Sequence, residues 1–202
     1  MTITVAYQGE PGAFSELAIL ALFGREAAPL PCERFADVVA AVESGRAELG
    51  LLPTDNSIAG PVIESVAAIE RSALVIAGTT ALPIELSLLA LPEATLESLQ
   101  SVESHPVALR QCRAFLGAHP RLVARESHDT AGAAREVAAS GDLTRGAIAS
   151  SHAGELHGLV ALATGLEDRA DNVTRFAIIA REPSPSLLSA LDDRGTTANF
   201  GR

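Results

Sequence analysis

Short runs of apolar residues alternate along this chain with segments in which apolar positions recur every three to four residues. The first run covers residues 3–8, and a Gly-Glu-Pro-Gly break separates it from a helical repeat between Phe14 and Leu22. The same alternation continues to residue 180. Alternating strands and helices predict an α/β protein with largely parallel strands.

The breaks between these runs place the remaining elements. Further strands are predicted to end at Phe35, to lie near Val102, and to span residues 49–52, 122–124, 147–149 and 174–180. Helices are predicted around residues 38–42, from Pro61, from Pro106, after Asp129 and through His152. Residues 53–60 are predicted to form a loop.

Two long extended stretches indicate that the chain crosses between two lobes. Residues 73–91 are strand-like for longer than one strand lasts, and residues 159–166 form a second extended stretch before the last strand. We expect two Rossmann-like lobes, one of residues 1–80 plus 168–182 and one of 81–167, with the active site in the cleft between them. Residues 183–202 are rich in Ser and Pro and are expected to be a poorly ordered tail.

Composition excludes several classes of function. The 202 residues are 48% hydrophobic and 20% charged, as in a soluble globular protein, and no stretch is apolar enough to span a membrane. A net charge of -10 repels nucleic acid and anionic lipid, so we expect neither as a partner. All 15 basic residues are Arg, which excludes Schiff-base catalysis and a P-loop lysine.

The cysteines and the N-terminus bear on location. Cys32 and Cys112 lie in apolar stretches and form no C-x-x-C pair, so neither a disulfide framework nor a zinc ribbon is expected. The first residues lack the basic region and long apolar run of a signal peptide. Their pattern is instead typical of a strand. These features favour the cytoplasm.

Three junctions between a predicted strand and the following helix carry small or hydroxyl-bearing residues: 9–15, 53–61 and 104–106. Unpaired N–H groups and the positive end of the helix dipole bind anions at such positions. A chain without Lys can bind a carboxylate in this way. The alternative is that Ser104 and Asn56 only cap their helices.

Four segments in sequence order resemble the prephenate dehydratase family and the closely related arogenate dehydratases. They are residues 5–16 (VAYQGEPGAFSE), 52–60 (LPTDNSIAG), 104–112 (SHPVALRQC) and 172–176 (NVTRF). Residues 129–131 and 147–150 also match, so the resemblance covers about residues 3–181. It implies a bilobed catalytic domain like that of type II periplasmic binding proteins, with the site in the cleft.

The resemblance also implies a reaction. Prephenate loses its ring carboxylate as CO2 and its C4 hydroxyl as water, which gives phenylpyruvate in the biosynthesis of L-phenylalanine. No cofactor or metal is implied, because the electrons released by decarboxylation expel the hydroxide. The resemblance assigns Thr174 as the donor to the departing oxygen and places Asn56 and Gln111 in the cleft as further catalytic residues.

Prephenate carries two carboxylates with opposite requirements. The pyruvyl carboxylate persists, whereas an ion pair to the ring carboxylate would stabilise the ground state more than the transition state. We therefore expect Arg175 to bind the persistent carboxylate, since Arg can do so with two hydrogen bonds. Ser57, Ser104, Phe176 and Asp55 complete the expected substrate-binding residues.

The chain departs from the family's pattern at three positions. Asp55 stands where Glu is usual, Thr54 replaces an apolar residue, and His157 replaces a Tyr. His157 also lies near His152 and Glu155, but the spacing is not H-E-x-x-H. Residues 152 and 157 are about 140° apart on a helix, so we expect no metal site there.

Two other functions remain open. Arogenate dehydratase differs in substrate, and a two-lobed cleft can also bind a small carboxylate without chemistry. The family suggests a homodimer or a larger homo-oligomer. It often appends an ACT domain that binds phenylalanine, and about 20 residues after the last strand are too few for one. We therefore expect weak or absent inhibition by phenylalanine.

Overall fold

A computed structural model describes residues 2–182 of the chain, in two compact units. The first unit contains residues 2–9, 14–83 and 173–182, and the second contains residues 10–13 and 84–172. Compared with the expected lobes, residues 81–83 belong to the first unit and residues 168–172 to the second. The predicted tail lies outside the described residues.

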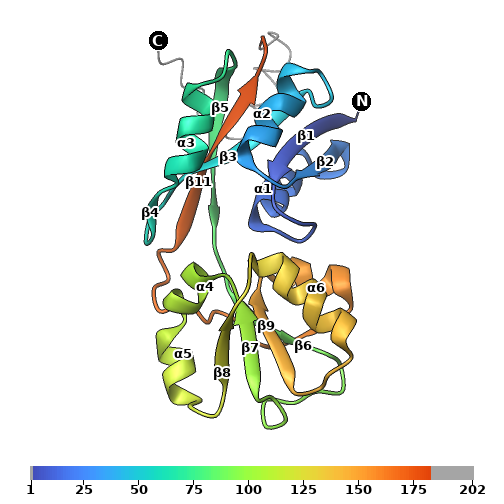
Figure 1. Cartoon of the computed structure of the whole chain (residues 1–202), viewed down its shortest axis with the longest axis vertical. Coiled ribbons are helices and arrows are strands. Elements are labelled where there is room, and N and C mark those ends of the chain that lie inside the picture. Colours follow the sequence, from blue (N-terminus) through green and yellow to red (C-terminus); the bar gives the residue numbers. More distant parts are fainter. Residues whose placement is uncertain (1, 183–202) are drawn as a thin grey trace. The chain divides into compact units, whose positions relative to one another are not determined.

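The first unit is built on one mixed sheet, shown in Figure 1. Its strands are β1 (Ile3–Gln8), β2 (Ala27–Cys32), β3 (Leu49–Asn56), β4 (Gly60–Pro61), β5 (Val75–Pro83) and β11 (Val173–Ala180). The order is β2-β1-β3-β11-β5, and β4 pairs with β3. β1 is parallel to β2 and β3, whereas β11 is antiparallel to both of its neighbours. The prediction of largely parallel strands therefore fails where the chain returns to this sheet.

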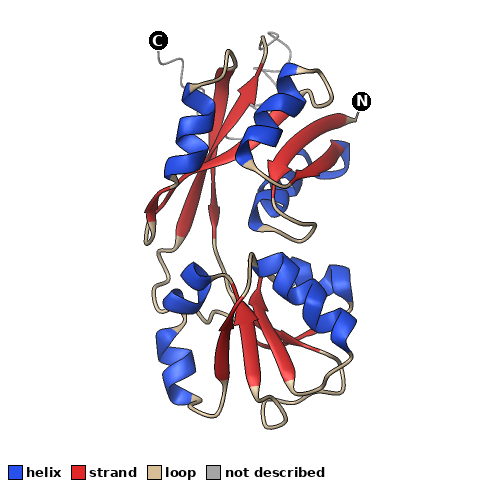
Figure 2. Ribbon diagram, in the orientation of Figure 1, coloured by secondary structure: helices blue, strands red, loops and turns tan. Residues whose placement is uncertain are grey.

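In the described part of the first unit, three α-helices and one 3-10 turn accompany this sheet (Figure 2). They are α1 (Phe14–Phe23), the 3-10 turn η1 (Gly24–Glu26), α2 (Phe35–Glu43) and α3 (Ile63–Glu70). Val38 and Val42 on α2 form a buried cluster with Leu52 of β3 and Ile179 of β11. Burial of these side chains fixes β11 beside β3, which is the pairing that builds the candidate site.

Local signals misplaced three boundaries in this unit. Phe35 begins α2 and does not end a strand. Residues 53–56 belong to β3 and not to a loop, because they pair with β11. Pro61 lies in β4 opposite Asp55, and α3 begins only at Ile63. The predicted helix start at residues 53–61 is therefore wrong, and no helix N-terminus is available there for an anion.

The second unit contains a separate mixed sheet. Its strands are β6 (Ser87–Ala90), β7 (Ser101–Ser104), β8 (Val123–Glu126), β9 (Arg145–Ala149) and β10 (Val160–Ala163), in the order β10-β6-β9-β7-β8. β7 is parallel to β8 and β9, whereas β6 is antiparallel to β9 and β10. The long stretch 73–91 thus divides into β5 of one sheet and β6 of the other, as expected for a crossing.

Small side chains let the helices of the second unit approach its sheet closely. The helices are α4 (Pro106–Gln111), α5 (Arg113–Ala118), α6 (Thr130–Ser140) and α7 (Ser151–His157). Ala133, Ala147 and Ala153 are fully buried in one cluster from α6, β9 and α7. Asp129 caps α6 as predicted, since its Oδ1 accepts a hydrogen bond from the Gly132 N–H. Within residues 2–182 no helix combines the length and apolar character needed to cross a membrane.

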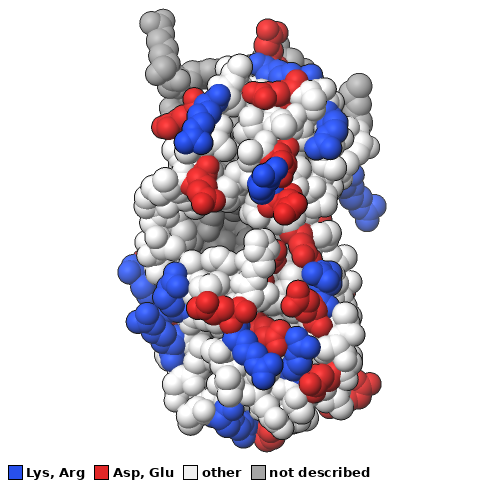
Figure 3. Space-filling model, viewed as in Figure 1, with Lys and Arg blue, Asp and Glu red and all other residues white. Residues whose placement is uncertain are grey.

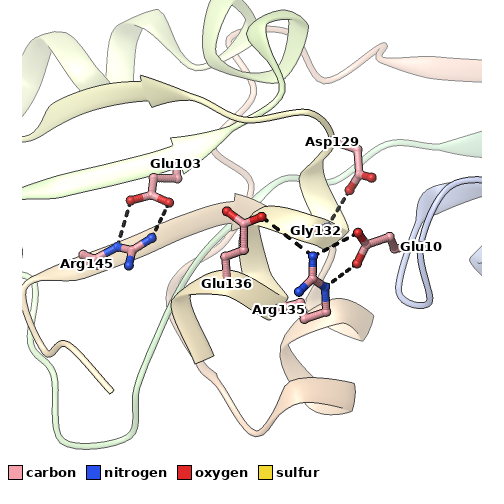
Figure 4. Close-up of polar contacts among 7 residues, drawn as sticks. All are labelled: Glu10, Glu103, Asp129, Gly132, Arg135, Glu136 and Arg145. Carbon is pink, nitrogen blue, oxygen red and sulfur yellow. Dashed lines mark hydrogen bonds and ion pairs between the residues drawn. The ribbon is translucent and has the colours of Figure 1, made fainter. Parts of the chain in front are cut away.

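The loop between β1 and α1 packs on the second unit, although the chain on both sides of it belongs to the first. Figure 4 shows Arg135 of α6 donating two hydrogen bonds to the Glu10 carboxylate. Ser150 donates to the Gly12 carbonyl oxygen at 2.8 Å. Gly12 has φ +95°, and a Cβ there would lie 2.9 Å from Ala153, so a side chain cannot be accommodated. This loop, expected to hold an anion, instead serves as a packed connection.

Candidate active site

Strand pairing brings Thr174 and Asn56 together, although 118 positions separate them in the sequence. Thr174 lies on β11, opposite Asn56 on β3 and opposite Leu82 on β5. The Asn56 side-chain nitrogen Nδ2 donates a hydrogen bond to Thr174 Oγ1 at 3.0 Å. Both residues are half-buried. The main-chain ladder therefore fixes the hydroxyl and the amide at contact distance.

The turn after β3 fixes which end of the Asn56 amide faces Thr174. Asn56 Oδ1 accepts hydrogen bonds from the N–H groups of Ile58 at 3.0 Å and Ala59 at 2.8 Å. Only the oxygen can accept from these donors, so the nitrogen must face Thr174. Thr174 Oγ1 therefore acts as an acceptor toward Asn56, and its own proton is directed to a different acceptor. This is the polarity required of a donor to a leaving oxygen.

Ser57 supports the same end of the ladder. Its N–H donates to the Val173 carbonyl oxygen at 2.9 Å, and its Oγ accepts from the Val173 N–H at 2.9 Å. These two bonds continue the pairing of β3 with β11 by one residue beyond Asn56 and Thr174. Ser57 thus holds the strand end that carries the predicted catalytic hydroxyl.

Arg175 pairs with Asp55, its neighbour across the strands. The distance from Arg175 Nη1 to Asp55 Oδ2 is 3.1 Å, and the side chains are 61% and 39% exposed. Successive side chains of a strand point to opposite faces, so Arg175 and Thr174 point apart. Thr54 donates its hydroxyl to the Arg175 carbonyl oxygen at 3.2 Å, which gives this unusual residue a structural contact.

A cavity of about 520 Å³ lies within the first unit between α1 and the strands β3, β5 and β11. Its walls include Ala18, Leu22, Thr54, Thr80, Arg175 and Phe176. This volume is in the range of small-molecule sites. Phe176 is only 1% exposed, so its ring is part of the core of the unit and contributes a wall rather than a mobile contact.

Gln111 is the last residue of α4, and a segment distant in sequence holds it at two points. Its backbone carbonyl oxygen accepts from the Asp168 N–H at 2.6 Å. Its side-chain Oε1 accepts from Asn172 Nδ2 at 3.2 Å. Neither Asp168 nor Asn172 was predicted as a site residue. Asn172 had one signal, its place directly before Val173-Thr174-Arg175 in a family motif, whereas Asp168 had none.

Ser104 does not have the environment predicted for a substrate-binding residue. It is fully buried, and its hydroxyl donates to the Ile148 carbonyl oxygen at 2.5 Å. The next residue, His105, caps α4, since its Nδ1 accepts from the Val107 N–H at 3.2 Å. Burial lowers the pKa of His105, with the neighbouring Arg110 charge as a second cause. The N-terminus of α4 is thus closed by its own cap.

The remaining histidine and cysteine side chains bear on metal binding and on thiol chemistry. Among the described residues no group of three His, Cys, Asp or Glu side chains is arranged to hold a metal ion. His157 Nε2 is buried and has no hydrogen-bond partner in the described part of the chain. Burial raises the pKa of Cys112 to about 12, so its thiol stays protonated and unreactive near neutral pH.

Solved structures similar to this chain share its fold. A prephenate dehydratase from Arthrobacter aurescens, solved with L-Phe, matches 90% of this chain and 61% of its own, with 28% identity and a TM-score of 0.83. An ABC transporter periplasmic substrate-binding protein from Coxiella burnetii matches with a TM-score of 0.50 and 14% identity, which concerns the fold alone. The predicted likeness to periplasmic binding proteins is therefore confirmed.

Curated relatives of this chain are named as arogenate and prephenate dehydratases. Arogenate dehydratase 1 of Petunia hybrida is 43% identical over 183 residues, which are 90% of this chain and 43% of the relative. A bifunctional N-acyl-homoserine lactone acylase/prephenate dehydratase of Komagataeibacter europaeus is 41% identical over 89% of this chain and 63% of the relative. The chain thus spans less than two thirds of either relative. The sequence pattern of prephenate dehydratase matches residues 5–184, and the chain belongs to the prephenate dehydratase family.

Proposed function

We propose that this chain catalyses the decarboxylating dehydration of prephenate to phenylpyruvate, water and CO2, a step of L-phenylalanine biosynthesis. The family match and the sequence of motifs support the reaction class. The observation that carries the proposal is the hydrogen bond from Asn56 Nδ2 to Thr174 Oγ1, with Asn56 Oδ1 held by two backbone amides. This bond uses Thr174 Oγ1 as an acceptor, so the hydroxyl proton of Thr174 can be donated to the oxygen of the leaving hydroxide.

The reaction needs a proton donor and no redox partner. The bond between the ring and its carboxylate breaks, CO2 leaves, and the electron pair enters the ring. The bond from C4 to the hydroxyl then breaks toward oxygen, and the departing hydroxide takes up one proton to form water. Prephenate dianion plus one proton therefore gives phenylpyruvate anion, CO2 and water. A positioned donor accelerates such a step by about 10²- to 10⁴-fold.

Thr174 supplies this donor in the proposal, and Asn56 sets its direction. A threonine hydroxyl is a weak acid, so its contribution is a hydrogen bond to the departing oxygen or the relay of a proton. Asn56 donates to the threonine oxygen, which polarises the hydroxyl in the direction that favours donation. Ser57 keeps the strand end in register through its two bonds to Val173.

Positive charge beside Gln111 in the second unit supports an anionic substrate. Arg110 and Arg113 flank Gln111 on α4 and α5. Figure 3 shows Arg side chains gathered over these helices, on a surface where acidic and basic groups are otherwise interspersed. This local excess attracts an anion despite the net charge of -10. Gln111 contributes a neutral hydrogen-bond donor at that position.

Arg175 binds the persistent pyruvyl carboxylate in this proposal, which requires its long side chain to reach around the edge of β11, because it starts on the opposite face from Thr174. An exposed ion pair such as that with Asp55 is worth only about 0–1 kcal/mol, so Arg175 can exchange Asp55 for a substrate carboxylate at little cost. Arg175→Lys should raise KM and leave kcat nearly unchanged, since Lys cannot form the two parallel bonds. An unchanged KM would remove Arg175 from the substrate site. Ser104 is left out of the proposal because it is buried and bonded to the backbone.

Arogenate is the second candidate substrate. It is favoured by the 43% identity to a relative named arogenate dehydratase. Arogenate carries an amino group where prephenate carries a keto group, so the two substrates differ only in the side chain that persists. The acid and leaving-group chemistry at Thr174 is the same for both.

The test is turnover of both substrates by the purified chain. Initial rates of phenylpyruvate formation from prephenate and of phenylalanine formation from arogenate give kcat/KM for each, and CO2 release checks the balance. A higher kcat/KM for prephenate is expected. A higher value for arogenate would select the second candidate. Binding of either compound without turnover, together with no effect of Thr174→Val, would favour a solute-binding module.

The assembly and the location of the protein belong to the same proposal. We infer a homodimer or larger homo-oligomer from family membership, and a cytoplasmic location from two buried cysteines that form no disulfide. Light scattering on the purified chain tests the first point. A mass equal to one chain of 20.9 kDa would contradict it.

A further inference from the structure

The segment of residues 166–172 returns the chain toward β11 without regular secondary structure. Three hydrogen bonds join it to residues 84–86 of the second unit, one of them from the Leu166 N–H to the Leu86 carbonyl oxygen at 3.0 Å. The Leu86 N–H donates to the Glu167 carboxylate at 2.8 Å, and the Ile84 N–H donates to the Asn172 carbonyl oxygen at 2.8 Å. These bonds attach the segment to the second unit.

The same segment also holds the junction between α4 and α5. The Asp168 carboxylate accepts from the N–H groups of Arg113 at 3.1 Å and Ala114 at 2.8 Å, the first two residues of α5. The Asp168 N–H donates to the Gln111 carbonyl oxygen, the last of α4. Cys112 between the helices has φ -116° and ψ 32°, so the helix is broken there. Asp168 therefore fixes where the main chain of Gln111 lies.

Asn172 then fixes the side chain of Gln111. Asn172 is only 2% exposed, and its Nδ2 donates to Gln111 Oε1 at 3.2 Å. A primary amide has an accepting end and a donating end, so a donor at Asn172 turns the Gln111 oxygen toward itself and the NH2 group away. We propose that Asn172 is a positioning residue that makes Gln111 present its NH2 group to a carboxylate of the substrate. The inference rests on the proposed function.

The direction of the amide matters because the substrate is a dianion. An ionised carboxylate only accepts hydrogen bonds, so the NH2 end of Gln111 attracts it and the oxygen end repels it. Asn172→Asp places an acceptor where the donor was, and Gln111 must then turn its NH2 inward to satisfy the buried carboxylate. Hydrogen bonds to charged groups favour that orientation strongly enough to reduce kcat/KM by about 10-fold or more.

A double-mutant cycle tests whether Asn172 acts through Gln111. Asn172→Asp is measured in the wild-type chain and in a Gln111→Ala chain, with kcat and KM determined separately. We expect a loss of about 10-fold or more in kcat/KM in the first and less than about 2-fold in the second. Equal losses in both backgrounds would overturn the proposal, because a purely structural role does not depend on the Gln111 side chain.

Control variants separate positioning from folding. Arg169→Gln changes an exposed residue of the same segment and should leave kcat/KM and the melting temperature unchanged. If Asn172→Asp does not fold, Asn172→Ser replaces it, since a serine can donate or accept. The loss of kcat/KM in Asn172→Ser should be below about 3-fold and should vanish in the Gln111→Ala chain. A loss of the same size in both backgrounds would again contradict the proposal.

One measurement does not depend on turnover. The side-chain NH2 signals of Gln111, assigned by their disappearance in Gln111→Ala, should shift and become more protected from hydrogen exchange in Asn172→Asp. Unchanged signals would overturn the positioning role even if the chain turns over neither prephenate nor arogenate. Absence of turnover together with the expected shift would overturn the proposed function and leave the Asn172–Gln111 contact established.

Discussion

Two asparagines, one in each unit, donate from their side-chain amides to a neighbouring residue, and they differ in what holds them. Asn56 lies in the ladder between β3 and β11, and two backbone N–H groups bind its oxygen. Asn172 lies on the irregular segment of residues 166–172, which is held by individual hydrogen bonds to residues 84–86 and 111–114. One position is set by a repeated main-chain pattern and the other by a few separate contacts.

This difference predicts different responses to substitution. A strand ladder distributes its stability over many main-chain hydrogen bonds, so a side-chain change at Thr174 or Asn56 should alter the chemistry and spare the fold. A segment held by a few separate main-chain and side-chain hydrogen bonds has less reserve. A change at Asp168 should therefore alter the stability of the second unit as well as its geometry.

The largest effect is expected for Thr174→Val. Valine keeps the β-branched shape and the strand pairing but removes the hydroxyl, so kcat should fall by about 10²- to 10⁴-fold. Thr174→Ser keeps the hydroxyl and should retain most of the activity. Initial rates of phenylpyruvate formation measure the effect, and thermal melts verify the fold. Full activity in Thr174→Val would exclude this hydroxyl from the chemistry.

A loss of about 10²-fold in kcat is expected for Asn56→Asp. The aspartate still accepts from the N–H groups of Ile58 and Ala59, so the turn persists. Its second oxygen, however, accepts from Thr174 and draws the threonine proton away from the leaving oxygen. The same Asn→Asp change at Asn172 is expected to cost less, because Gln111 binds substrate and does not donate to the leaving group. Equal kcat in Asn56→Asp and wild type would contradict the proposed direction of this bond.

A smaller effect, on stability, is expected for Asp168→Asn. The change removes the negative charge and one of the two acceptors at the start of α5, which should lower the free energy of unfolding by about 1 kcal/mol. Urea denaturation measures the change. Arg34→Gln on the surface of the first unit is a suitable reference, because its exposed pair with Asp37 should contribute little. Two variants of equal stability would show that Asp168 does not hold the junction.

The smallest effect concerns the pH dependence of the second unit. Because the pKa of His105 is lowered in the folded chain, the unfolded chain binds a proton first as pH falls below about 6.5. Stability should therefore decrease as pH falls through this range. Melting temperatures near pH 7.5 and 5.5 should differ less in His105→Asn, which still caps α4. An unchanged difference would assign the pH dependence to other groups.

Glu10 provides a contrast within the same unit. The hydrogen bond from Arg135 lowers the pKa of Glu10, so its contribution to stability is present above the ordinary carboxyl pKa and is lost as pH falls below it. This range is more acidic than that of His105. The two contributions can therefore be separated by pH alone.

The type and order of most elements could be predicted from apolar periodicity. The strand at residues 3–8 and the helix after Asp129 were found as predicted, because their signals are local and strong. The helix start at Pro61 was wrong, although proline is common there, because pairing with Asp55 draws Pro61 into β4. Local preference was outweighed by a contact between strands.

The motifs predicted residue types at the candidate site but not their mutual geometry. Asn56 and Thr174 lie in separate motifs, and only the register of β3 with β11 shows that they touch. Ser104 matched a motif equally well, yet its hydroxyl is used by the Ile148 carbonyl oxygen. Asp168 belongs to no recognised pattern, since its role depends on α5 being nearby in space.

The sequence by itself determined the α/β class, the membership in the prephenate dehydratase family and the absence of lysine chemistry, because periodicity, motifs and composition are properties of the chain read in order. The tertiary structure alone decided the direction of each hydrogen bond at Asn56 and Gln111. Direction depends on which donors and acceptors meet in space, and those partners are distant in sequence.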